Sequence, residues 1–147
     1  MTHDQDKPRP FPWRCPACRA KAVEPASVSY KAPFRHDGKE RLVEVPSLRI
    51  PKCRQCGELV FDNEADEQVA NAFRRDMGMM LPEEIRTQRE SLRLTQRQLA
   101  DALGVAIETI SRWETGLVIQ SRAMDRYLRT FFTIPEARTA LTASAAK

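Results

Sequence analysis

Residues 94–116 read LTQRQLADALGVAIETISRWETG, and this stretch decides the fold of the C-terminal half of the chain. Its small and apolar residues have the spacing of two short helices joined by a tight turn. Ala100 allows the helices to cross closely, and Gly104 suits the left-handed backbone of the turn because it has no Cβ. The residues predicted to pack between the helices are Leu99, Leu103, Ile110 and Trp113. The pattern therefore predicts a helix-turn-helix unit that holds its second helix at a fixed angle.

The second helix of this unit has a predicted outward face. Because Ile110 and Trp113 point inward, the helical period turns the following residues outward: Ala106, Ile107, Glu108, Ser111, Arg112 and Thr115. In a DNA-binding unit, Arg112 can donate two hydrogen bonds to guanine, and Ile107 can contact a thymine methyl group. Glu108 can accept from cytosine or hold the Arg112 guanidinium in place, and we favour the second role. The alternative is a helical hairpin whose polar face contacts only water.

The stretch resembles the helix-turn-helix domain of the XRE/Cro family of prokaryotic regulators, from its LTQ to its ISRWETG. The resemblance implies that Gln96 contacts a DNA phosphate. A further helix is expected to begin after a cap at Ser121, where Arg122 would strengthen a phosphate contact; the alternative is a solvated cap. The complete set of predicted DNA contacts is Gln96, Arg97, Ala106, Ile107, Glu108, Thr109, Ser111, Arg112, Thr115, Ser121 and Arg122.

The four cysteines form two pairs, Cys15-x-x-Cys18 and Cys53-x-x-Cys56. This arrangement is typical of a structural zinc site with four thiolate ligands. Disulfides or free thiols are one alternative, and a catalytic or redox site is another. We favour one structural Zn²⁺ per chain, because four thiolates saturate a tetrahedral ion and leave no position for water. A domain this small needs the binding energy of the metal to fold.

Composition restricts the possible classes less than the motifs do. The chain has 147 residues, with 24 Lys and Arg against 20 Asp and Glu, and a net charge of +4 that alone does not indicate nucleic acid. No apolar run is long enough for a membrane span or a signal peptide, which predicts a cytoplasmic location where metal binding is favoured over disulfides. No combination of histidine, carboxylate and nucleophile suggests an active site, so we predict that the protein is not an enzyme.

The order of segments predicts an α+β protein, with a small N-terminal zinc-bound β domain followed by an all-α helix-turn-helix domain of XRE/Cro type. A flexible tail is expected over residues 1–12, and the β domain over 13–62, with short strands and a hairpin turn at 36–38. A linker helix and hinge are expected over 63–81, with Asn63 as the helix N-cap. Residues 82–147 are predicted to form the DNA-binding and dimerisation domain.

The cysteine pairs, the PEEIR after the linker helix, and ISRWETG followed by QSRAMDR together resemble the YgiT-type zinc-finger family of MqsA-like antitoxins. The resemblance implies an N-terminal domain that binds zinc and a cognate toxin. It also implies a C-terminal domain that dimerises on a palindromic operator of its own operon. By position, the four cysteines match the zinc ligands, and Arg112 matches a base-contacting arginine. Glu108 replaces a base-reading asparagine, so the operator sequence does not transfer.

The sequence therefore predicts a homodimeric transcriptional repressor that binds double-stranded DNA sequence-specifically. The predicted role is the antitoxin of a type II toxin–antitoxin system, which neutralises a toxin and regulates its own operon. One alternative is a regulator with the same domains and no toxin partner. Another is a zinc-ribbon adaptor that binds protein or RNA, supported by the modest net charge and by the basic residues Arg14, Arg19, Arg49, Lys52 and Arg54.

Overall fold

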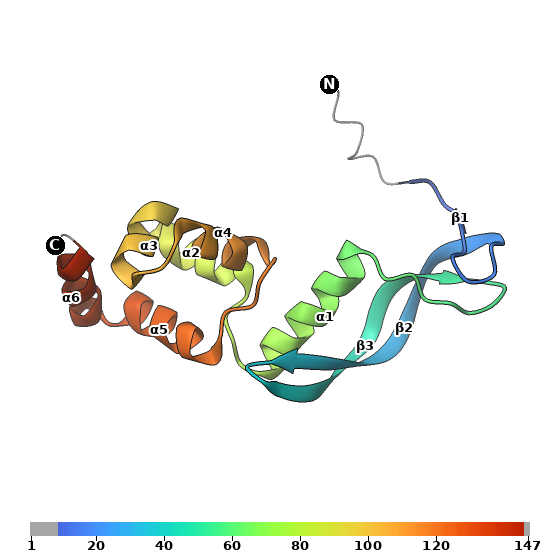
Figure 1. The fold of residues 1–147 in the computed structure, drawn as a ribbon, viewed down its shortest axis with the longest axis horizontal. Coiled ribbons are helices and arrows are strands. Elements are labelled where there is room, and N and C mark those ends of the chain that lie inside the picture. Colours follow the sequence, from blue (N-terminus) through green and yellow to red (C-terminus); the bar gives the residue numbers. More distant parts are fainter. Residues whose placement is uncertain (1–8, 146–147) are drawn as a thin grey trace, which may run out of the picture. The chain divides into compact units, whose positions relative to one another are not determined.

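The computed structural model describes residues 9–145, which form three strands followed by six helices (Figure 1). The predicted α+β class is confirmed. The strands are β1 (Trp13–Arg14), β2 (Lys21–His36) and β3 (Lys39–Cys53). The helices are α1 (Asn63–Asp76), α2 (Pro82–Ser91), α3 (Gln96–Leu103), α4 (Ile107–Thr115), α5 (Arg122–Thr133) and α6 (Pro135–Ala145). No helix within residues 9–145 has the length and apolar character needed to cross a membrane.

The chain divides into two compact units. The first comprises Met1–Ala32 and Leu42–Val69, and the second comprises Pro33–Arg41 and Ala70–Lys147. Residues 1–8 of the predicted flexible tail lie outside the described residues. Within the described part, Phe11 stacks on Trp13 with the ring centroids 4.4 Å apart, and Trp13 Nε1 donates to the carbonyl of Arg9 at 3.0 Å.

The three strands form one sheet in the order β1-β2-β3. Strand β1 pairs antiparallel with β2, with Trp13 opposite Val23. Strands β2 and β3 are joined at Asp37 and Gly38, whose φ angles of 50° and 73° are those of a two-residue hairpin turn. This confirms the predicted turn, but β2 and β3 have 16 and 15 residues, so the prediction of short strands was wrong.

The N-terminal part of α1 packs within the first unit, where Ala65 and Val69 are buried. Ala65 donates its backbone N–H to Oδ1 of Asp62 at 2.8 Å, so Asp62 is the N-cap and the prediction of Asn63 was wrong by one residue. Gln68 donates to the carbonyl of Arg49 at 2.8 Å and accepts from its backbone N–H at 2.9 Å. This side-chain amide satisfies both backbone groups of Arg49, as a neighbouring strand would do.

Helices α2 to α6 enclose one apolar core. Its buried members are Met80, Ile85, Leu99, Ala100, Ala102, Leu103, Ile110, Trp113, Leu128, Phe131 and Phe132. Thr95 caps α3 by accepting from the N–H of Gln98, whose side chain accepts in turn from the N–H of Thr95. Gly104 takes a φ of 74° between α3 and α4. The predicted turn and core of the helix-turn-helix unit are therefore present.

A buried polar cluster holds the segment that precedes α2. Asp125 of α5 accepts from the backbone N–H of Met80 at 2.8 Å, and Gln120 donates to the Met80 carbonyl at 2.9 Å. Arg129 donates to Asp125 at 2.9 Å and to the carbonyl of Gly78 at 2.8 Å. These bonds satisfy the backbone of a segment that was predicted as a hinge, and they tie it to α5.

Candidate metal centre and nucleic-acid interface

The two Cys-x-x-Cys segments fold into the same tight turn. In each turn the backbone carbonyl of the first cysteine accepts from the N–H of the residue four positions later. The backbone N–H of the same cysteine donates to the carbonyl of the residue five positions later. The bonds are Arg19 N–H to Cys15 O (2.9 Å), Cys15 N–H to Ala20 O (2.8 Å), Gly57 N–H to Cys53 O (3.0 Å) and Cys53 N–H to Glu58 O (2.8 Å). Each turn also contains a positive φ, 65° at Arg19 and 80° at Gly57. The shared backbone explains why the two pairs have the same spacing.

The four sulfur atoms form one compact group. All lie within 4.8 Å of one another, with 3.6 Å between Cys15 and Cys56 and 3.6 Å between Cys18 and Cys53. A tetrahedral zinc ion with bonds of about 2.3 Å separates its sulfur ligands by roughly 3.8 Å, so the group has the dimensions of such a site. A disulfide needs about 2.05 Å. All four cysteines are free thiols that can hold a metal ion, consistent with one structural Zn²⁺.

The hydrogen bonds and charges at the cysteines fit the binding of a cation. A backbone hydrogen bond from Cys18 lowers the pKa of Cys15, and one from Cys56 lowers the pKa of Cys53 to about 7. At Cys56 a backbone hydrogen bond from Glu58 favours the thiolate, yet desolvation and the neighbouring cysteines raise its pKa to about 12. Four thiolates at this separation repel one another, so a divalent cation is needed between them for all four to be deprotonated.

The apolar core next to this group is small. Its buried residues are Cys15, Val23 and Cys53, and Trp13, Ala22 and Val60 are only partly buried. Two of its three buried members are therefore cysteines of the candidate metal site. Since so few side chains leave water here, we expect a bound metal ion to supply much of the folding free energy of the turns.

The predicted DNA-contacting residues fall into two groups by exposure. The exposed ones are Arg97, Ala106, Glu108, Arg112, Thr115 and Arg122. The partly buried ones are Gln96, Ile107, Thr109, Ser111 and Ser121. Helix α4 thus presents Arg112 to solvent, with Ile110 and Trp113 buried on its opposite side. The expected ion pair between Glu108 and Arg112 is not found among the ion pairs of residues 9–145, so the guanidinium is not held by that carboxylate.

Four of the predicted contacts have roles inside the fold. Ile107 packs against the core of the helical unit, and the Gln96 amide donates to Oε1 of Glu114 at 3.3 Å. The Ser121 hydroxyl caps α5 by accepting from the N–H of Met124. Arg122 donates from Nη1 to the carbonyl of Met77 at 3.2 Å, and its backbone N–H donates to Asp37 at 2.9 Å.

A buried ion pair that the sequence reasoning missed joins α2 to α4. Arg89 donates from Nε and Nη2 to the two carboxylate oxygens of Glu114, at 2.8 and 2.9 Å, and from Nη1 to the carbonyl of Leu94 at 2.7 Å. The side chains are only 11% and 3% exposed. Hydrogen bonding to Glu114 raises the pKa of Arg89. The pair fixes the orientation of the helix that carries Arg112.

Comparison with known proteins agrees with this arrangement of a cysteine site and a helical unit. No curated protein matches the sequence at a significant level. A family model described as the antitoxin component of a bacterial toxin-antitoxin system, MqsA, matches residues 13–139, which include all four cysteines and helices α1 to α5. The chain therefore belongs to the MqsA antitoxin family.

Proposed function

We propose that the protein is a homodimeric repressor that binds a palindromic operator of its own operon and neutralises a cognate toxin. The family supports an antitoxin role. The observation that carries the DNA-binding part is the exposed position of Arg112 on α4, a helix held by the buried pair of Arg89 and Glu114. An arginine on a rigid helix can read guanine in the major groove through two parallel hydrogen bonds.

In this proposal, residues 13–62 form the zinc-binding domain, 63–81 the linker helix and hinge, and 82–147 the DNA-binding and dimerisation domain. One Zn²⁺ is held by Cys15, Cys18, Cys53 and Cys56 and has a structural role, because its four thiolates leave no position for a substrate. The metal maintains the shape of the domain that we assign to toxin binding. Neutralisation by covering the toxin surface needs no catalytic residue.

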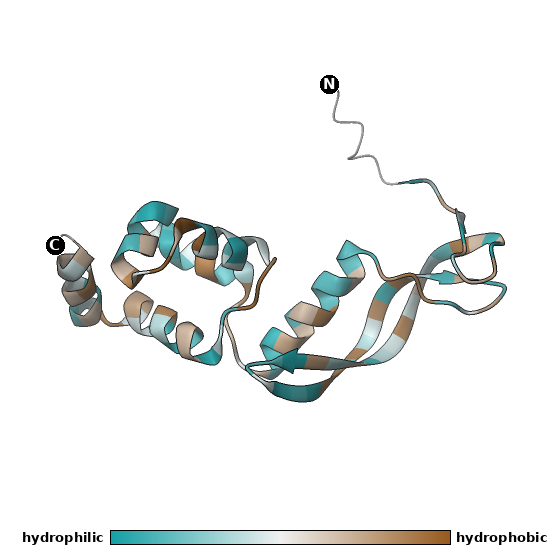
Figure 2. Cartoon of the chain, in the orientation of Figure 1, coloured by the Kyte–Doolittle hydropathy of each residue, from teal (hydrophilic) through white to brown (hydrophobic). Residues whose placement is uncertain are grey.

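In this proposal α4 reads the bases, and exposed residues on and beside it make further polar contacts with DNA. Arg97 and Thr115 can donate to phosphate oxygens, and Glu108 can accept from a base amino group. In a two-fold symmetric dimer, the paired α4 helices would enter major grooves about 34–36 Å apart or at a multiple of that distance. The segment between α4 and α5 contains an exposed apolar pair, Leu117 (76% exposed) and Val118 (44%), which supports burial against another chain. Figure 2 shows hydrophobic (brown) colouring along this segment.

The substitution Arg112→Ala should weaken binding to the protein's own promoter by about 1–3 kcal/mol and relax the preference at one base pair. The physical reason is the loss of a forked contact to a base edge. Gel-shift titrations with a panel of single-base variants measure both effects. The matched control is Arg86→Ala, which removes an exposed arginine of α2 that pairs with Glu90. If Arg112→Ala binds as tightly and selectively as Arg86→Ala, our assignment of Arg112 is wrong.

The toxin part of the proposal predicts a stable complex with the product of an adjacent reading frame. Co-expression and affinity purification of the two proteins measure this. The complex should form with Arg112→Ala and be lost when the chelated protein is used, because the proposed contacts lie on the zinc domain. If no neighbouring product binds the zinc-loaded protein, the proposal of toxin neutralisation fails and the DNA-binding part stands alone.

A further inference from the structure

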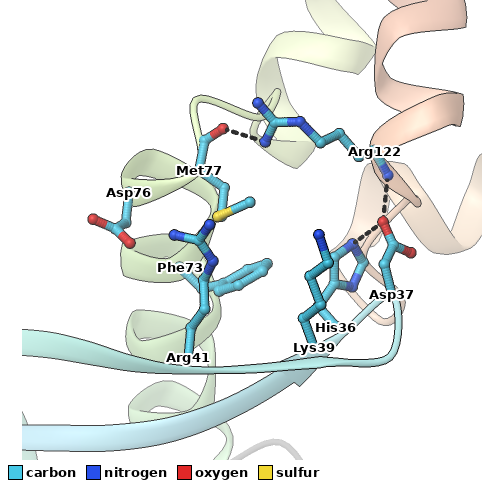
Figure 3. A pocket seen from close by; sticks show the side chains of 8 residues that line it. All are labelled: His36, Asp37, Lys39, Arg41, Phe73, Asp76, Met77 and Arg122. Carbon is cyan, nitrogen blue, oxygen red and sulfur yellow. Dashed lines mark hydrogen bonds and ion pairs between the residues drawn. The ribbon is translucent and has the colours of Figure 1, made fainter.

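The N-terminus of α5 is occupied by a carboxylate from the β2–β3 hairpin. The N–H of Arg122, the first residue of α5, donates to Oδ2 of Asp37 at 2.9 Å, although the two residues are 85 positions apart in sequence (Figure 3). Ser121 already satisfies the N–H of Met124 in the same turn. Asp37 therefore accepts from a backbone donor that the helix itself leaves unsatisfied.

The hairpin tip is held in this position by aromatic packing. Phe34 stacks on Phe73 of α1 with the ring centroids 4.5 Å apart, and His36 meets the same ring edge-on at 5.2 Å. Asp37 and Gly38 follow immediately in the tight turn, so the docked strand directs the Asp37 carboxylate towards α5. The contact to Arg122 is thus part of a packed arrangement within the second unit.

The Asp37 carboxylate lies among basic side chains at a helix N-terminus, an environment that favours an anion. It lines a cavity of about 290 Å³ together with the basic side chains of Lys39, Arg41 and Arg122, as Figure 3 shows, and one further carboxylate, Asp76, lies in the same lining. A helix N-terminus surrounded by cations binds a carboxylate or a phosphate by the same hydrogen bonds and charges. Only one of these anions can occupy the Arg122 N–H at a time.

We propose that Asp37 is an internal substitute for a DNA phosphate, so that the hairpin tip and operator DNA compete for the N-terminus of α5. This inference rests on the proposed DNA-binding function and on the sequence prediction that Ser121 and Arg122 contact the DNA backbone. With Asp37 in place, the N–H of Arg122 is unavailable and a negative charge faces any approaching phosphate. DNA binding then requires the hairpin tip to leave α5. The apparent Kd equals the Kd of the released state divided by the fraction of molecules in that state, so a small released fraction weakens binding.

The test compares the full-length zinc-loaded protein with Asp37→Asn and Asp37→Gly, using a duplex from the region upstream of its own gene. Asparagine and glycine both suit the positive φ of this turn position, so the hairpin is retained. Both variants should bind the duplex roughly three- to ten-fold more tightly, with the larger gain for glycine, which has no acceptor. The control is Glu40→Gln, which removes an exposed charge from the same hairpin and should change affinity by no more than about two-fold.

Amide hydrogen exchange supplies a second measurement on the free proteins, in which the N–H of Arg122 should exchange faster in both Asp37 variants. If the wild type binds the duplex and the Asp37 variants bind no more tightly than Glu40→Gln, the competition is refuted while DNA binding stands. If Glu40→Gln gives the same gain, the effect is one of net charge and the inference also fails. If no variant binds the duplex, both the inference and the proposed DNA-binding function fail.

Discussion

Removal of zinc should unfold the cysteine turns and the strands beside them while helices α2 to α6 keep their structure. The buried residues around the four cysteines are few, and Cys15 and Cys53 are themselves part of that core. Structural Zn²⁺ sites supply about 10–16 kcal/mol of apparent binding free energy in small metal-dependent domains, which exceeds what this core can replace. The helical unit has its own apolar core, in which no cysteine takes part.

Hydrogen–deuterium exchange of the full-length protein, resolved by segment and measured before and after chelation, tests this prediction. Protection should be lost around residues 13–24 and 50–60 and kept in α2 to α6. Cys53→Ser should reproduce the loss without a chelator, whereas Gln55→Ala, an exposed change inside the same turn, should not. Acidification should act in the same direction as chelation, because protons compete with Zn²⁺ for the thiolates. Unchanged protection in the chelated protein would contradict a structural role for the metal.

Replacement of Glu114 by alanine should destabilise the helical unit by about 3–5 kcal/mol, because it leaves the guanidinium of Arg89 buried without its carboxylate. The two side chains are 11% and 3% exposed and share two hydrogen bonds shorter than 3.0 Å. The raised pKa of Arg89 means that it stays protonated wherever the protein is folded. Its stabilising contribution is complete below its ordinary pKa and is lost only as the pH rises through the raised pKa.

Thermal and urea unfolding, followed by the helical circular dichroism signal, measure this destabilisation. Glu108→Ala removes an exposed carboxylate from the same helix and should change stability by about 0.5 kcal/mol or less. The double variant Arg89→Met/Glu114→Leu should lose less unfolding free energy than the sum of the losses in the single variants Arg89→Met and Glu114→Leu. In the double variant neither partner of the pair is left buried with an unpaired charge. Equal effects of Glu114→Ala and Glu108→Ala would show that the pair does not hold α4.

Local features of this fold were predictable because their causes lie within a few residues. Thr95 and Gln98 cap α3, and Ser121 caps α5, through side chains three residues from their partners. Gly104 takes the left-handed conformation that the turn requires. The two Cys-x-x-Cys segments predicted the sulfur cluster, because their spacing matches the turn that a tetrahedral ion needs.

Contacts between distant residues were not predictable, because no local pattern encodes them. Three such contacts depend on how the elements pack. They are the ion pair of Arg89 with Glu114, the hydrogen bonds of Gln68 with the Arg49 backbone, and the hydrogen bond of the Arg122 N–H to Asp37. The strands β2 and β3 are longer than predicted. They include four prolines, Pro25 and Pro33 in β2 and Pro46 and Pro51 in β3. Proline is tolerated in a strand where no ladder hydrogen bond needs its N–H.

The central claim, sequence-specific DNA binding through α4, is tested most directly by footprinting the purified protein on the DNA upstream of its own gene. Competition with a scrambled duplex of equal length and composition gives the specificity ratio. We expect two protected half-sites whose centres are about one helical turn of 34–36 Å apart, or a multiple of it. The specific site should bind at least ~10³-fold more tightly than the scrambled duplex, with affinity falling steeply as salt is added. Equal affinity for the two duplexes, with no footprint at any salt concentration, would contradict the account.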